Sequence, residues 1–204
     1  QLLANITPGP ANESGQTIQI TGVSPVSLQG GTVALVAGNV IYTPPSNYSG
    51  PDSFSITVTD NGLTNGLAAP QSAVFVVNVT VVDKNDAPIT VPKSGTTLED
   101  TALSFTIAAL MLGDTPGPAS ETPPLGTQTI TFFGVVPTST NGGTVQVVGT
   151  NVIYTPRADF NGTDTFFYEI QDNGLSNGVL DPQIGRGTVT VTVTPVNDDP
   201  RVAN

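Results

Sequence analysis

Cysteine and histidine are both absent from this 204-residue chain. Without cysteine it has no disulfide and no thiolate metal site. Without histidine it lacks the general base of most serine and cysteine nucleophiles, and also an imidazole metal ligand. Basic residues are scarce, because 5 Lys and Arg stand against 16 Asp and Glu, for a formal net charge of −11. A chain this acidic is repelled by nucleic acid and by anionic membrane surfaces, so we expect no nucleic-acid partner.

Long apolar runs are missing too. No stretch approaches the roughly 18 consecutive apolar residues of a membrane-spanning helix, so we expect no membrane insertion. The 22 Gly and 18 Pro are spread between short runs rich in Val, Ile, Phe and Tyr. This pattern predicts many short strands joined by turns. The length suits two domains of roughly 100 residues each.

The chain contains an internal repeat. Residues 31–62 read GTVALVAGNVIYTPPSNYSGPDSFSITVTDNG, and residues 143–174 read GTVQVVGTNVIYTPRADFNGTDTFFYEIQDNG. A fixed period of this kind indicates structural units arranged in series. Apolar residues alternate with polar ones along both copies, as in strands that face a core on one side. The strands are expected at residues 16–23, 32–43 (two strands), 52–60 and 72–83, and at 102–107, 128–135, 144–149, 151–155, 164–172 and 188–196.

Six or seven alternating strands per roughly 100 residues predict an all-β fold of two tandem, Ig-like antiparallel β-sandwiches. We expect domains at residues 1–86 and 87–198, with 199–204 as the start of a following repeat or a tail. Residues 91–107 supply the first strands of the second sandwich and have no equivalent in the first. The first domain is therefore expected to lack its N-terminal strands within this chain, either because the chain is a piece of a longer one or because a neighbouring chain donates a strand.

Several motifs converge on one family. KNDAP (84–88) and VNDDP (196–200) end the two repeats, LEDTAL (98–103) opens the second, and GTV…NVIYTP…FNGTDTFFYEIQDNG fills its middle. Together they resemble the bacterial cadherin-like tandem repeats of very large surface and secreted proteins. The resemblance covers almost the whole chain. It implies cadherin-like β-sandwich modules of extracellular, cell-surface adhesins or matrix proteins, which often depend on calcium.

The same resemblance implies calcium at the module junctions. Calcium takes six to eight oxygen ligands, and at a hinge it would join carboxylates that otherwise repel each other. The Asp-Asn-Gly and Asn-Asp motifs also suit ordinary turn and Asx-cap roles, which stay open as the alternative. The ligands implied are Asp83, Asn85, Asp86 and Asp172 at one junction, and Glu99, Asn197 and Asp198 at the next.

The remaining conspicuous residues have structural interpretations. Asp52 and Asp164 each precede a strand and are expected to close tight turns through their side chains. Tyr42 and Tyr154 are expected to be core or corner tyrosines with the polar end in water. Asp159 and Asp164 resemble a pair of glycosidase carboxylates, but the first repeat has Asn in place of Asp159. No phosphate loop or nucleophile motif is found, so we predict no enzyme, no catalytic residue and no organic cofactor.

The sequence thus predicts a structural or adhesive segment of an extracellular tandem-repeat protein. Its junctions would be stiffened by calcium, and its partners would be neighbouring repeats or identical subunits. One alternative is a module that binds carbohydrate or protein, such as surface glycans, through the long Asn-Gly loops at residues 61–71 and 173–183. Another is a filament subunit that polymerises by a donated β-strand.

Overall fold

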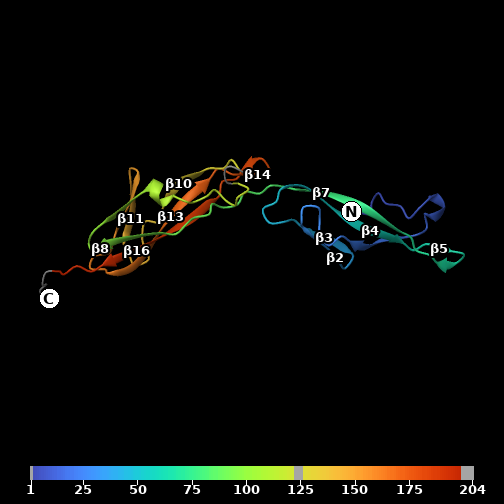
Figure 1. Cartoon of the computed structure of the whole chain (residues 1–204), viewed down its shortest axis with the longest axis horizontal. Coiled ribbons are helices and arrows are strands. Elements are labelled where there is room, and N and C mark those ends of the chain that lie inside the picture. Colours follow the sequence, from blue (N-terminus) through green and yellow to red (C-terminus); the bar gives the residue numbers. More distant parts are fainter. Residues whose placement is uncertain (1, 122–125, 199–204) are drawn as a thin grey trace. The chain divides into compact units, whose positions relative to one another are not determined.

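The computed structural model describes residues 2–121 and 126–198, and the chain forms two compact units (Figure 1). Unit 1 is Gln1–Asp83 and unit 2 is Lys84–Asn204. The sequence placed this boundary three residues later. The difference arises because Asn85 and Asp86 make their hydrogen bonds inside unit 2, to Asp172 and Glu121. The tail expected at 199–204 lies outside the described residues.

Both units are almost entirely β-structure, which confirms the predicted fold class. Where a strand was expected at residues 102–107, a strand at Leu103–Thr106 is followed by one turn of helix at Ile107–Leu110. Among the described residues, no helix is long and apolar enough to cross a membrane. The elements of unit 1 are η1 (Ala11–Glu13), β1 (Ile18–Val23), β2 (Thr32–Val36), β3 (Asn39–Thr43), β4 (Gly50–Asp60), β5 (Leu63–Thr64), β6 (Leu67–Ala68) and β7 (Ser72–Val81). Those of unit 2 are β8 (Lys93–Leu98), β9 (Leu103–Thr106), α1 (Ile107–Leu110), β10 (Ile130–Val135), β11 (Thr144–Val148), β12 (Asn151–Thr155), β13 (Gly162–Asp172), β14 (Leu175–Ser176), β15 (Val179–Leu180) and β16 (Ile184–Thr194).

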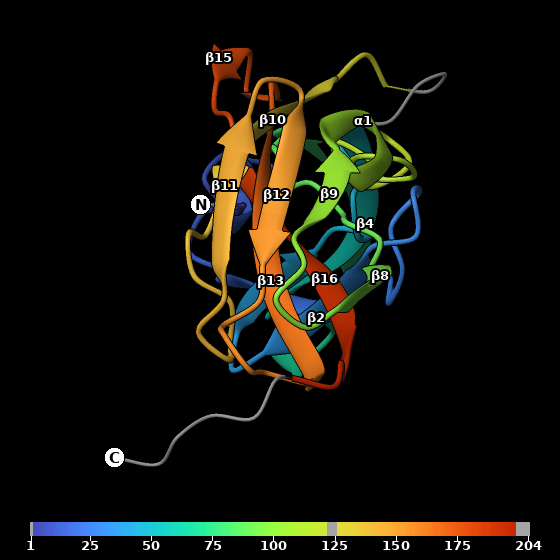
Figure 2. The ribbon, with the colours of Figure 1, turned by 90° about the vertical axis from the view of Figure 1, so that its left-hand side faces the viewer.

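Unit 2 is a complete sandwich of two sheets. One sheet has the order β10-β13-β16-β8 and the other β11-β12-β9. Figure 2 shows β11, β12 and β9 side by side, with α1 following β9. Alternate residues of each strand face the core, and Phe166, Tyr168 and Ile170 of β13 are fully buried there. Among the residues that the structure describes, the expected antiparallel arrangement has one departure, because β8 joins β16 in parallel.

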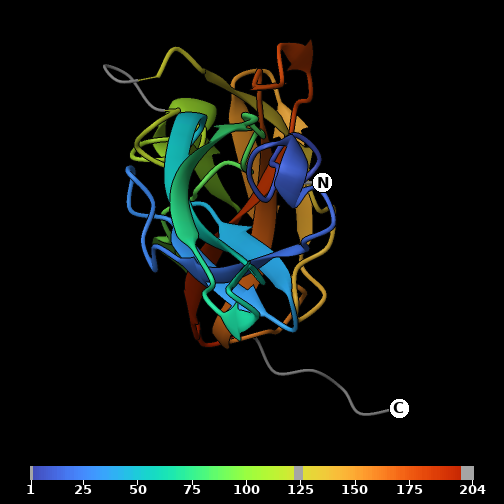
Figure 3. The same cartoon turned by 90° about the vertical axis from the view of Figure 1, so that its right-hand side faces the viewer.

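Unit 1 repeats this arrangement with two strands fewer, as the sequence predicted. Its sheets are β1-β4-β7 and β2-β3, coloured blue to green in Figure 3. The buried core is correspondingly small: Val33, Phe54, Ile56 and Val58. Among the described residues, β3 pairs only with β2 and β7 only with β4. The outer edges of β3 and β7 are therefore open where unit 2 has β9 and β8.

The sequence suggested that the two Asn-Gly segments, residues 61–71 and 173–183, are long loops, but they are not irregular. Each is a small two-stranded hairpin, β5–β6 in unit 1 and β14–β15 in unit 2. The turns are Asn65-Gly66 (φ 53° and 79°) and Asn177-Gly178 (φ 50° and 76°). Two consecutive positive φ values are typical of the type I′ turn, which Asn-Gly favours in two-residue hairpins.

Candidate functional site

The aspartate of each Asp-Asn-Gly motif organises the hairpin that follows it. Asp172 Oδ1 accepts the backbone N–H groups of Gly174 and Gln183, both at 3.0 Å. Asp60 Oδ1 accepts the two corresponding N–H groups in unit 1, at 2.8 and 3.0 Å. The turn role is therefore present in both units. In unit 2 alone, Asp172 also accepts the side-chain amide of Asn85, at 2.8 Å.

Asn85 is held in one orientation by its neighbours. Its Nδ2 donates to Asp172 Oδ1 and to the backbone oxygen of Asp181, both at 2.8 Å. Its backbone N–H donates to Ser176 Oγ at 2.9 Å. A Cβ at Gly174 would lie 1.8 Å from Asn85 Oδ1, so only glycine leaves room for this side chain. Two predicted ligands, Asn85 and Asp172, are thus in direct contact within unit 2.

This contact leaves two oxygen atoms without donors. Asn85 and Asp172 are 3 % and 4 % exposed, and among the described residues Asn85 Oδ1 and Asp172 Oδ2 have no hydrogen-bond partner. A buried acceptor without a partner costs roughly 1–3 kcal/mol. Asn85 cannot exchange its oxygen and nitrogen to help, because its NH₂ group already serves two acceptors. Two orphaned oxygens, one of them carboxylate, fit the ligand preference of a hard cation such as Ca²⁺.

Asp86 and Glu121 lie beside this pair. The backbone N–H of Asp86 donates to Glu121 Oε1 at 3.1 Å, and Glu121 is buried. Residues 85–86 are thereby held between Asp172 and Glu121. Sequence reasoning missed Glu121, although a signal existed: Pro-Gly-Pro-x-x-Glu occurs at both 8–13 and 116–121. Asp83, the other predicted ligand here, is exposed after β7 in unit 1.

The second predicted group lies at the far end of β16. Glu99 is buried, its backbone N–H donates to Thr194 O at 2.9 Å, and its Oε1 accepts the N–H of Val196. This bonding fixes the chain just before Asn197 and Asp198, which are both exposed. Glu99 therefore has a structural role in the described residues, and the sequence did not foresee it.

Asp198 belongs to a cluster of carboxylates that the sequence identified only in part. Side-chain oxygens of Asp100, Asp159 and Asp198 all lie within 4.8 Å of one another, and all three residues are exposed. The backbone N–H of Asp159 donates to Asp100 Oδ1 at 3.2 Å. Asp100 and Asp159 have φ values of 59° and 57°, which Asp tolerates better than most residues. Asn197 directly precedes Asp198 in the chain.

Asp164 has a structural role in the core of unit 2. It is 1 % exposed and accepts the hydroxyls of Ser139 and Tyr154 and the N–H of Asn141. Burial by itself raises the pKa of Asp164, but these hydrogen bonds outweigh burial and lower it. Burial and the bond to Asp164 raise the pKa of Tyr154. The predicted wet hydroxyl of Tyr154 is wrong, since this residue is fully buried and its hydroxyl is bonded to Asp164.

Unit 1 contains the same network around Asp52. This carboxylate accepts the hydroxyls of Ser27 and Tyr42 and the backbone N–H groups of Gln29 and Ser53. Burial opposes ionisation of Asp52, but these bonds prevail and lower its pKa from 3.8 to about 2. Both aspartates therefore do more than close a turn, because they join separate strands and loops of one unit.

Three comparisons with known proteins were made, and one of them, with a family model, agrees with the two-unit architecture. A search of curated proteins finds no match. Among solved structures, the chain is similar to a point variant of the endo-fucoidan hydrolase MfFcnA4 from glycoside hydrolase family 107, with 15% identity and a TM-score of 0.32 over 89% of this chain. The similarity spans 24% of the hydrolase chain, and no argument follows from so low a score. The family model of the bacterial Ig domain matches residues 2–69 and again residues 85–194. Because these matches cover most of the sequence, the chain belongs to the bacterial Ig domain family.

Proposed function

We propose that this chain is a structural or adhesive segment of an extracellular tandem-repeat protein, of the cadherin-like kind, with calcium-stiffened junctions. Two bacterial Ig domains in series support a repeat array, and such domains are common in extracellular proteins. The net charge of −11 and the absence of histidine support a role in cation binding and spacing instead of catalysis. The chain is proposed to act without enzymatic activity.

One observation carries this proposal: the buried oxygens Asn85 Oδ1 and Asp172 Oδ2 receive no hydrogen bond among the described residues. Asn85 belongs to the KNDAP linker, whereas Asp172 ends β13 inside the sandwich. An ion bound by both would fix the linker to unit 2. Glu121 and Asp86 would add oxygen ligands from residues already joined by a hydrogen bond.

The acidic cluster of Asp100, Asp159 and Asp198 would form half of a second junction, together with Glu99 and Asn197. Three carboxylates within 4.8 Å of one another repel, and a divalent cation would offset that repulsion. Repeat 1 replaces Asp159 with Asn, so its corresponding end carries less negative charge.

Calcium titration of the full chain tests the proposal. We expect added Ca²⁺ to release or absorb heat in calorimetry and to raise the melting temperature of unit 2, and EDTA to reverse the rise. Asp172→Asn should abolish the part of the response that comes from the Asn85 site. Asp60→Asn is the matched control, because this aspartate has the same hairpin bonds without an Asn85 neighbour. An unchanged melting temperature with Ca²⁺ and with EDTA, and no binding heat, would contradict calcium stiffening.

The filament alternative has a specific observation in its favour, namely the open edges of β3 and β7 in unit 1. The carbohydrate alternative has weaker support. Both hairpins expose aliphatic side chains, among them Leu63, Leu67 and Val179, but residues 61–71 and 173–183 contain no aromatic residue on which a sugar would stack. These exposed tips suit a protein surface better, and a glycan array with no binding would exclude the carbohydrate reading.

A further inference from the structure

The hairpin β14–β15 of unit 2 rises directly from the residues of the candidate calcium site. Its two strands have two residues each and pair at two positions. A two-stranded hairpin is marginally stable in water by itself, so the order of this one depends on the bonds at its base. The base is closed by the backbone bond from Asp181 N–H to Gly174 O, at 2.9 Å, and by the two N–H groups that Asp172 accepts.

Asn85 joins the two arms of this hairpin. Its backbone N–H donates to Ser176 Oγ of β14 at 2.9 Å, and its Nδ2 donates to the backbone oxygen of Asp181, which follows β15, at 2.8 Å. The Ser176 hydroxyl in turn donates to Asp181 Oδ2 at 2.6 Å. One linker residue therefore bonds to both arms while it also donates to Asp172.

The hairpin β5–β6 of unit 1 provides an internal comparison. The aspartate bonds and the backbone bond that close the base are present in both units. Unit 1, however, has Thr64 and Ala69 at the positions of Ser176 and Asp181. Alanine has no carboxylate, so the bond that the serine hydroxyl makes between the arms in unit 2 has no equivalent in unit 1.

The position of Asn85 is stabilised by these bonds and destabilised by two unsatisfied oxygens. Asn85 Oδ1 and Asp172 Oδ2 are buried and receive no hydrogen bond among the described residues, which is costly. A cation that binds both oxygens would remove this cost. It would thereby favour the arrangement in which Asn85 contacts both arms of the hairpin. Binding of the cation and order of the hairpin would then be coupled, and such coupling acts in both directions.

Ser176 and Asp181 act on this arrangement by position and not as cation ligands. Both carboxylate oxygens of Asp181 already accept hydrogen bonds, Oδ2 from Ser176 at 2.6 Å and Oδ1 from Gln183 Nε2 at 3.0 Å. The backbone oxygen of Asp181 accepts the bond from Asn85. Each oxygen of Asp181 thus has a donor, unlike those of the candidate ligands. Ser176 and Asp181 are therefore positioning residues.

We propose that calcium bound by Asn85 and Asp172 orders the hairpin β14–β15, and that the hairpin in turn sets the calcium affinity through Ser176 and Asp181. This inference rests on the proposed function and deepens it, because it names the element that the ion controls. The hairpin exposes Val179 (68 %) and Leu180 (66 %), so calcium fixes the position of an aliphatic surface on unit 2. The hairpin of unit 1 is independent of calcium.

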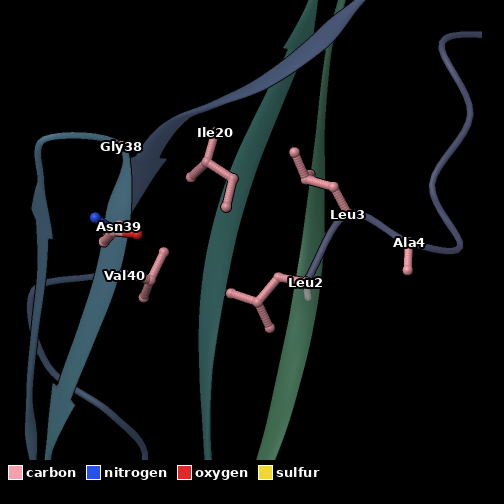
Figure 4. Close-up of a pocket in the computed structure, with 7 residues that line it drawn as sticks. All are labelled: Leu2, Leu3, Ala4, Ile20, Gly38, Asn39 and Val40. Atoms are coloured by element: carbon pink, nitrogen blue, oxygen red, sulfur yellow. The ribbon is translucent and has the colours of Figure 1, made fainter.

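The apolar groove of unit 1 offers no competing cation site. It has a volume of about 580 Å³, and Figure 4 shows the side chains of Leu2, Leu3, Ile20 and Val40 around it. None of the described residues that line this groove carries a carboxylate. Calcium is therefore not expected to act on unit 1 through the groove, which supports the use of β5–β6 as the control hairpin.

Hydrogen exchange of the full chain, with and without added Ca²⁺, tests the proposal. We expect the amides of residues 175–180 to exchange about fivefold more slowly, or slower still, when calcium is bound, since coupling between sites typically changes equilibria at least that much. The amides of residues 63–68 should exchange at the same rate in both conditions. Calorimetry on the same sample records whether the ion binds.

Ser176→Ala tests the reciprocal effect without removing a proposed ligand. The change deletes the hydroxyl that accepts from Asn85 and donates to Asp181. We expect the calorimetric affinity for Ca²⁺ to fall by about fivefold, the typical effect of one hydrogen bond. Ser176→Thr keeps a hydroxyl and should retain the affinity. Thr64→Ala in β5 is the matched control and should leave it unchanged, and melting in EDTA shows that each variant is folded.

The contrary results have distinct meanings. Binding heat with unchanged exchange in β14–β15 would overturn this inference and leave the proposed calcium site in place. Equal slowing in both hairpins would assign the effect to general stabilisation and would also overturn it. Wild-type affinity in Ser176→Ala would refute the reciprocal effect. Absence of binding heat in the wild type would contradict the proposed function itself, and this inference with it.

Discussion

The hydroxyl of Tyr154 donates a 2.7 Å hydrogen bond to the carboxylate of Asp164, and Tyr42 makes the same 2.7 Å bond to Asp52 in unit 1. In both units the carboxylate also accepts a serine hydroxyl, from Ser139 in the loop between β10 and β11 and from Ser27 in the loop between β1 and β2. One side chain therefore joins a loop, the strand that contains the tyrosine and the strand that contains the aspartate. Because burial disfavours the carboxylate unless every bond is made, this network favours a single arrangement of the three segments.

Removing the carboxylate should destabilise unit 2 more than removing the hydroxyl. We expect Asp164→Ala to lower the free energy of unfolding by about 3–4 kcal/mol, since it leaves the buried hydroxyls of Tyr154 and Ser139 without an acceptor. Tyr154→Phe should cost about 1–2 kcal/mol. Urea denaturation followed separately by NMR signals of each unit measures both. Equal costs for the two variants would contradict the view that the aspartate is the centre of the network.

The same network predicts an acid-sensitive stability. A carboxylate whose folded pKa is lowered contributes stability that is complete above its unfolded pKa, near 4, and is lost as the pH falls through the folded value. For Asp52 the folded pKa is about 2, against 3.8 ordinarily. We therefore expect the unfolding free energy of unit 1 to decline between about pH 4 and pH 2.

Asp52→Asn separates this effect from general acid denaturation. The variant should be less stable at pH 6 and should decline less steeply below pH 4, because its amide does not titrate. Urea denaturation at pH 6, 4, 3 and 2 gives both slopes. If wild type and variant lose stability in parallel, Asp52 is not the group that titrates.

The strands were predictable from the sequence because their signal is local. Alternation along β4 and β13 predicted the inward faces that Phe54 and Phe166 occupy, and Asn-Gly is a known turn pair, although its role as the tip of a hairpin was not recognised. The incompleteness of unit 1 was also visible, since residues 91–107 have no earlier counterpart. What the sequence could not supply was the parallel pairing of β8 with β16, because strand pairing depends on distant segments.

The candidate site was less predictable for the same reason. Asn85 and Asp172 were foreseen through a family resemblance, but their direct contact spans 87 residues and leaves no local pattern. Glu121 lies beside the Asn85–Asp172 pair, and Asp159 lies in the cluster with Asp100 and Asp198. Both residues are brought there by loops whose course depends on the whole fold. The compensating differences between units, such as Tyr168 with Gly187 against Ile56 with Phe75, become interpretable only once these residues are seen as cross-strand neighbours.

Tyr168 and Gly187 should therefore be strongly coupled. A Cβ at Gly187 would lie 2.1 Å from the Tyr168 ring, so we expect Gly187→Ala to cost about 2–3 kcal/mol through overpacking. In a Tyr168→Ile background, which reproduces Ile56 of unit 1, the same change should cost less than about 1 kcal/mol. A double-mutant cycle from urea denaturation measures the coupling. Additive costs would contradict this steric explanation.

Gly174→Ala should disrupt the candidate calcium site without altering any carboxylate. The added methyl carbon would lie 1.8 Å from Asn85 Oδ1 and would force this side chain away from Asp172. We expect calorimetric affinity for Ca²⁺ to fall by about tenfold, the equivalent of about 1.4 kcal/mol, and the NMR signals of the Asn85 amide to shift. Gly134→Ala is the matched control, because its Cβ would meet nothing within 4 Å. Since Asp172 keeps its charge in both variants, a lost affinity in the first alone would identify the Asn85 oxygen, and not general acidity, as the selective ligand. Unchanged affinity would leave Asn85 with only its structural bonds to Asp172 and Asp181.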